Sequence, residues 1–88
     1  MPHVVINHGV EDVERWLKGK AERAAQISKF GSHVTDHVAM DGSKTVAVTA
    51  DIDDLAALQA ALASPPQDLQ DAMQRHGVIP PLTFHIEK

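Results

Sequence analysis

Residues 32–51 read SHVTDHVAMDGSKTVAVTAD, and this stretch decides the fold. Apolar and polar residues alternate over Ser32–Met40 and again over Lys44–Asp51, which is typical of strands with one buried face. Asp41-Gly42 lies between the two runs and is typical of a tight turn, because glycine adopts the positive φ angles that hairpin turns need. We therefore predict an antiparallel hairpin at the centre of the chain.

A strand and a helix are predicted before this hairpin. His3–His8 is a short run with β-branched residues, which favours a strand that Gly9 ends. From Val10 to the stop at Gly31, apolar residues recur at helical spacing. The predicted inward stripe of this helix comprises Val13, Trp16, Leu17, Ala21, Ala24 and Ala25.

Two helices and a last strand are predicted after the hairpin. Asp53 or Asp54 is placed to cap a helix that Pro65-Pro66 ends, because proline cannot continue a helix interior. Ser64 is placed to cap a second, shorter helix. Leu82–Glu87 then predicts the final strand.

This order of elements is the split βαβ, or ferredoxin-like, β-α-β-β-α-β arrangement of the α+β class. A four-stranded antiparallel sheet then carries its helices on one face, and 88 residues make a single domain, 1–88. The helix-facing positions are predicted to be Val34, Val38, Val46, Val48, Phe84 and Ile86.

The opposite face of the predicted sheet is rich in histidine and threonine. It comprises His33, Thr35, His37, Thr45, Ala47, Thr49, Thr83, His85 and Glu87. The first strand can bury either of its two sides, so Asn7 and His8 compete for this face. An uncovered sheet face is either solvated or covered by a partner. Because this face mixes polar and small apolar residues, we predict a homodimer that packs sheet to sheet, a dimeric α/β barrel with a polar, histidine-lined cavity.

Composition excludes several functions. The chain has no cysteine, which removes disulfides and zinc–thiolate sites. Its net charge of −4 argues against nucleic acid, which needs a clustered basic surface. No apolar run has the length of a membrane span or the form of a signal peptide, so we expect a cytoplasmic protein without a membrane partner. No cofactor motif is present, and we predict no cofactor.

Two groups of residues resemble a known superfamily. VVINHGVED at residues 4–12, with Trp16 after it, resembles the start of small dimeric α/β-barrel proteins of the broad superfamily that includes the antibiotic-biosynthesis monooxygenases. Later residues resemble the closing half of the same proteins, namely Ala63-Ser64-Pro65, Leu69, Ala72-Met73, Gly77-Val78 and Pro80-Pro81. The resemblance covers nearly the whole chain and implies a ferredoxin-like protomer, a homodimer and a ligand cavity. Activities vary widely across this superfamily, so a shared fold carries little functional weight.

The haem-degrading branch of that superfamily is matched at one position only. Asn7 matches the asparagine that these enzymes carry on the first strand. Ala61 stands where they have a tryptophan, and Met73 stands where they have the histidine that binds haem, with His76 one turn further on. Haem degradation is therefore not expected.

The candidate site residues lie mostly on the predicted polar face. We predict ligand contacts from Asn7, His8, His33, Thr35 and Thr49. The predicted function is binding of a small molecule, with a cofactor-free monooxygenase, isomerase or cyclase as the alternative. In that alternative, His37 or His85 acts as general base on a polyphenolic or enolisable substrate, because histidine titrates near neutrality. Asn7 then donates a hydrogen bond to the developing oxyanion.

Each of these residues also has a purely structural interpretation. The histidines of the polar face can be hydrogen-bonded interface residues without a ligand. His8 can simply bond near Asp12, and Asp36 can mark a bulge or an edge of the sheet. His33 and His37 lie about 13–14 Å apart along one strand, too far to share a metal ion, and no metal site is predicted.

Overall fold

The computed structural model describes residues 2–88 and has the predicted ferredoxin-like α+β fold. The sheet is antiparallel, with strand order β2-β3-β1-β4. The elements in chain order are β1 (His3–Val10), α1 (Val13–Lys18), α2 (Lys20–Ile27), β2 (Gly31–Val38), β3 (Thr45–Ile52), α3 (Leu55–Ala63), α4 (Gln67–Arg75) and β4 (Val78–Ile86).

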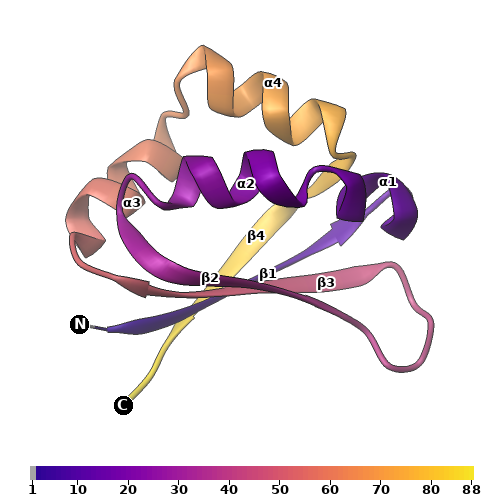
Figure 1. Ribbon diagram of the computed structural model, residues 1–88, viewed down its shortest axis with the longest axis horizontal. Coiled ribbons are helices and arrows are strands. Elements are labelled where there is room, and N and C mark those ends of the chain that lie inside the picture. The colour runs from indigo at the N-terminus through magenta and orange to yellow at the C-terminus, as the bar shows by residue number, and fades with distance from the viewer. Residues whose placement is uncertain (1) are drawn as a thin grey trace.

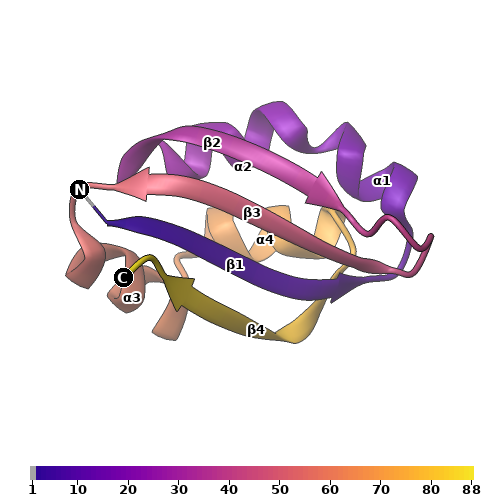
Figure 2. The same ribbon diagram turned by 90° about the horizontal axis from the view of Figure 1, so that it is seen from below.

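The molecule has two layers. All four helices lie on one side of the sheet, with α2 and α4 running across it (Figure 1). Within residues 2–88, no helix or strand covers the other side of the sheet, and Figure 2 looks directly onto it. We call this side the open face. None of the helices within residues 2–88 is both long and apolar enough to cross a membrane.

Pairing with β3 decides which side of β1 is buried. Asn7 pairs with Ala47, and Ile6 pairs with Val48. The residues of β1 that lie on the buried side, next to the buried residues of β3, are therefore Val4, Ile6, His8 and Val10. Asn7 points to the open face. This settles the competition between Asn7 and His8, because neighbouring residues in register share a face.

The first helical region is broken at Gly19 into α1 and α2. Asp12 caps α1 by accepting hydrogen bonds from the backbone N–H groups of Glu14 and Arg15. Trp16 is fully buried, as predicted. The rest of the predicted stripe is partly wrong, because the buried side follows the line from Trp16 to Arg23, seven residues apart. Leu17, Ala21 and Ala25 are exposed, and Arg23 takes the inward position.

The helices after the hairpin also differ in detail from the prediction. Asp54 caps α3 by accepting from the N–H of Ala57. Ser64 ends α3 instead of starting α4, and the extended Pro66 stands at the N-cap of α4. Proline has no N–H and a fixed φ, so it fits the first position before a helix. Gly77 follows α4 with φ +72°, a conformation that favours glycine.

Candidate functional site

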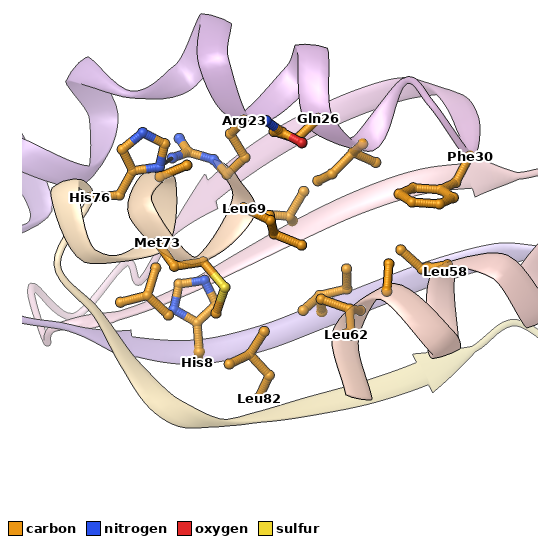
Figure 3. Close-up of a pocket in the computed structure, with 16 residues that line it drawn as sticks. His8, Arg23, Gln26, Phe30, Leu58, Leu62, Leu69, Met73, His76 and Leu82 are labelled. Carbon is orange, nitrogen blue, oxygen red and sulfur yellow. Dashed lines mark hydrogen bonds between the residues drawn. The ribbon is translucent and has the colours of Figure 1, made fainter. Parts of the chain in front are cut away.

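A cavity of about 80 Å³ lies between the sheet and helices α2, α3 and α4. One end of the cavity is polar, with His8, Arg23, Gln26 and His76, and the other end is apolar (Figure 3). The apolar wall includes Ile6, Phe30, Leu58, Leu62, Met73 and Leu82. A cavity with few polar groups on an apolar lining is the usual form of a small-molecule site.

His8 presents an unpaired nitrogen to the polar end of the cavity. Its Nδ1 bonds the carbonyl oxygen of Gly9 at 2.8 Å, and a carbonyl only accepts, so Nδ1 carries the hydrogen. In the neutral ring, Nε2 then holds a lone pair, and no described residue within 2–88 bonds to it. Burial lowers the pKa of His8, the Gly9 bond opposes this, and the charge of Arg23 adds to the lowering. His8 is therefore a neutral hydrogen-bond acceptor at pH 7.

Arg23 is held by partners within the protein. Its Nε and Nη2 donate to the two carboxylate oxygens of Asp36 at 3.1 and 2.7 Å. Its Nη1 donates to the carbonyl oxygen of Trp16, and the guanidinium lies 3.8 Å from the centroid of the Trp16 ring. Side-chain exposure is 8% for Arg23 and 3% for Asp36, so this is a buried ion pair. Asp36 does lie on an edge strand, β2, but it is a buried charge and not a bulge residue, because the shift in register lies between Ser32 and Thr35.

His76 links Glu22 to Arg23. Its Nε2 donates to a Glu22 carboxylate oxygen at 2.8 Å, and its Nδ1 accepts from Arg23 Nη1 at 3.3 Å. A carboxylate only accepts and a guanidinium only donates, so both bonds together require the neutral ring with hydrogen on Nε2. Burial lowers the pKa of His76; Glu22 opposes this, and the charge of Arg23 adds to the lowering.

Gly19 allows His76 to take this position. A Cβ atom at residue 19 would lie 2.2 Å from His76 Nε2, far inside van der Waals contact. The break between α1 and α2 therefore coincides with the point where α4 brings its histidine against the chain. Glycine is required here by the close contact with His76 and not by its backbone conformation, since any residue can adopt its φ of −87°.

Five of the predicted site residues meet on the open face. His37 Nε2 bonds Thr49 Oγ1 at 3.0 Å, and Asn7 Nδ2 donates to His85 Nδ1 at 3.4 Å. Thr35 is paired with Thr49. A groove of about 370 Å³ runs over this face and is lined by residues that include Asn7, His37, Ala47 and Thr83. The roles of these residues in binding or catalysis stay predictions.

His33 lies apart from that group, at the bulge of β2. Its φ is +56°, and its Nδ1 lies 3.1 Å from one oxygen of Asp51, whose other oxygen is 3.0 Å from Nδ1 of His3. The hydrogen bond from His3 is the main cause that lowers the pKa of Asp51; burial opposes it, and the charges of His3 and His33 add to the lowering. Within residues 2–88, no three His, Cys, Asp or Glu side chains are arranged to hold a metal ion.

The polar end of the cavity contains three residues that were not predicted as site residues, Arg23, Gln26 and His76. Arg23 follows Trp16 by seven residues, about two helical turns, so it shares the buried side of that tryptophan once the helix is followed through Gly19. His76 directly precedes Gly77, so its position in the sequence indicates only a residue at the end of a helix. His8 is the one predicted ligand contact that lines this cavity.

The chain has the fold of small ferredoxin-like proteins whose solved structures are described as antibiotic biosynthesis monooxygenases. A candidate antibiotic biosynthesis monooxygenase of Bordetella bronchiseptica matches with a TM-score of 0.75 and 12% identity, over 99% of this chain and 94% of that chain. Another antibiotic biosynthesis monooxygenase matches with a TM-score of 0.68 and 11% identity, over 100% of this chain and 97% of that chain. A candidate of the same kind from Deinococcus radiodurans matches with a TM-score of 0.61 and 15% identity, over 100% and 91% of the two chains.

These structural matches confirm the predicted resemblance at the level of the fold. At such low identities they carry no activity or substrate over to this chain. No protein-family model and no curated protein matches the sequence. The function is therefore argued from the residues of the cavity.

Proposed function

We propose that the protein binds a small, uncharged molecule with a hydroxyl group on an apolar body, in the cavity between the sheet and the helices. The observation that carries this proposal is the lone pair of His8 Nε2 beside an apolar wall. A hydroxyl group of the ligand would donate to it. A single polar contact of this kind orients a ligand whose remaining surface is buried by apolar side chains.

The charge of Arg23 does not favour an anionic ligand. Its Nε, Nη1 and Nη2 all donate to protein acceptors, and Asp36 neutralises its charge. A carboxylate or phosphate in the cavity would lose its hydration without gaining a free cation. An uncharged ligand avoids this loss.

The size of the cavity sets a second condition. A cavity of roughly 150 Å³ holds a benzene ring, whereas this one measures about 80 Å³. Binding of a ring therefore requires a side chain to move. Met73 lines the cavity and is unbranched, so it adapts more easily than its branched neighbours.

Binding of phenol and toluene, measured by calorimetry on wild type and on His8→Phe, tests this proposal. We expect His8→Phe to weaken phenol binding about two- to tenfold, the net value of one hydrogen bond, and to leave toluene unchanged. His37→Phe, on the open face, is the matched control and should change neither. Absence of phenol binding to wild type, or equal binding to His8→Phe, would contradict the proposal.

Proton abstraction by His8 is the second candidate function. A neutral histidine with an open Nε2 next to a bound enolisable molecule is placed to accept its proton. This is the step that cofactor-free oxygenases, isomerases and cyclases share. Exchange of the acidic C–H for deuterium in a bound enolisable ketone, followed by NMR, would report it. His8→Phe should abolish the exchange; if His37→Phe or His85→Phe abolishes it instead, the base lies on the open face.

We also propose that the protein is a homodimer in which a second copy covers the open face. Support comes from the composition of that face. Val5, Ala47 and Thr49 are only partly buried there, on the side of the sheet that no helix covers. Its histidines and threonines can satisfy one another, as His37 and Thr49 already do.

A further inference from the structure

We propose that the ligand carries an apolar tail, which lies in a second hollow between α3 and β4. This inference rests on the proposed function and extends it to the shape of the ligand. The second hollow has a volume of about 180 Å³, and its lining includes Val4, Leu55, Phe84 and Ile86. We call it the α3–β4 groove.

The groove contains large apolar side chains that the fold leaves uncovered. Phe84 is 48% exposed and Ile86 is 40% exposed, although both face the helix side of the sheet. Their partners across the strand pair, Ile6 and Val4, are 7% and 4% exposed. The contrast arises because β4 is an edge strand that α3 covers only in part. Exposed apolar groups in a hollow mark a place where another apolar group binds.

The cavity and the groove are neighbours. Leu58 and Leu62, one turn apart on α3, line both of them. The two hollows therefore meet at these two side chains, and we infer that a rotamer change at Leu62, which is partly exposed, joins them. Figure 3 shows both leucines at the apolar end of the cavity, away from Arg23 and His76.

The chemistry along this path defines the ligand class. A hydroxyl group at His8 comes first, then a ring against the apolar wall, then a short alkyl chain past Leu58 and Leu62 onto Phe84 and Ile86. The predicted ligand is therefore an uncharged, hydroxylated ring with a short apolar tail. A molecule with a charged tail would lose its hydration in the groove, whose lining is mainly apolar, with Gln59 and His85 as its polar members.

A series of phenols with lengthening tails tests the inference. Calorimetry with phenol, 4-ethylphenol, 4-butylphenol and 4-hexylphenol should give affinities that rise about fourfold for each buried CH₂, until the tail fills the groove. Phe84→Ser should reduce this dependence on tail length, and Leu62→Trp, which fills the space between the hollows, should abolish it. Phe84→Ser should bind phenol itself as wild type does, because Phe84 does not line the cavity. Leu62 lines the cavity, so each affinity of Leu62→Trp is compared with the phenol affinity of the same variant.

Ile79→Ser is the matched control, because Ile79 is 44% exposed on the same strand and lines neither hollow. It should keep the full dependence on tail length. If phenol binds and depends on His8, but affinity stays flat along the series, the tail site is wrong and the proposed function stands. If no member of the series binds wild type, the proposed function fails first. If the variants Phe84→Ser and Ile79→Ser behave alike, the tail binds elsewhere.

Discussion

His76 shows how one residue joins three parts of the molecule. It follows the last turn of α4, donates to Glu22 on α2, accepts from Arg23, and packs against Gly19. These contacts hold the ring neutral and in one orientation. They also close the polar end of the cavity, so the orientation of His76 sets the shape that a ligand meets there.

Gly19→Ala should destabilise the protein, although the same change in an ordinary helix stabilises it by about 1 kcal/mol. The new Cβ would overlap His76, which lies 2.2 Å from its position. We expect a loss of about 1–3 kcal/mol in the free energy of unfolding, measured by urea denaturation. Gly9→Ala is the control, since its Cβ would meet its nearest atoms at 3.7 Å. A stabilised Gly19→Ala variant would contradict the close contact.

Stability should fall below about pH 6.5, because of His8 and His76. Burial lowers the pKa of both residues in the folded protein. Between the unfolded pKa of about 6.5 and the lower folded values, the unfolded chain binds protons that the folded chain does not. The free energy of unfolding therefore decreases as pH falls through this window, by at most about 1.4 kcal/mol per pH unit for each histidine.

Urea denaturation at pH 7.5 and 5.5 checks this effect of pH. His8→Phe and His76→Gln should each lose less stability than wild type between the two values. His37→Gln, on the open face, should behave as wild type does. An equal loss in all of these proteins would assign the pH dependence to other groups.

At the scale of elements, the buried ion pair of Arg23 and Asp36 connects α2 to β2. Both charges are almost fully removed from solvent and are satisfied by two hydrogen bonds. Such a pair contributes little net stability compared with apolar residues of similar size, but removal of one partner leaves a buried charge alone. It therefore specifies where α2 sits on the sheet more than it adds to stability.

Arg23→Met should cost about 3–5 kcal/mol in the free energy of unfolding, because Asp36 is left without a partner. The double variant with Arg23→Met and Asp36→Leu should recover most of this loss. The control is Lys29→Met. Lys29, which lies just after α2, pairs with Asp68 of α4 at 55% and 58% exposure, where a change of about 1 kcal/mol or less is expected. A double variant as unstable as Arg23→Met would show that the charges themselves are required.

At the scale of the whole molecule, the two proposed sites lie on opposite sides of the sheet. The cavity for the ligand lies on the helix side of the sheet, and the proposed dimer interface lies on the open face. His8 and Asn7 are consecutive on β1 and belong to opposite sides. Ligand binding and dimer formation are thus separable by substitution.

Ala47→Arg should produce a monomer. Ala47 lies near the centre of the open face, between Asn7 and His37 in the register of the strands. A large charge there would be buried without a partner if a second copy covered the face. Light scattering coupled to gel filtration gives the mass of each protein in solution. Gln70→Arg, exposed on α4, is the control and should remain dimeric. A monomeric wild type would refute the dimer.

The local pattern of the sequence determined the strands, the hairpin and the helix positions. Alternation in Thr45–Ile52 and the stop at Gly77 are properties of neighbouring residues, so they could be predicted directly. The fold class follows from the order of these elements. Among the predicted ligand contacts, His8 lines the cavity, and the roles of the others stay predictions.

Tertiary structure decided everything that depends on residues far apart in the chain. Both sides of β1 carry residues that can be buried, so pairing with β3 decided which side faces the helices. Arg23 is buried because Asp36 and His76 meet it in space, and Gly19 is needed because His76, 57 residues later, packs against it. A polar residue is satisfied or not by its partners in the folded chain. For that reason the order of strands and helices follows from local patterns in the chain, whereas the folded structure alone brings His8, Arg23 and His76 to one end of a cavity on the helix side of the sheet.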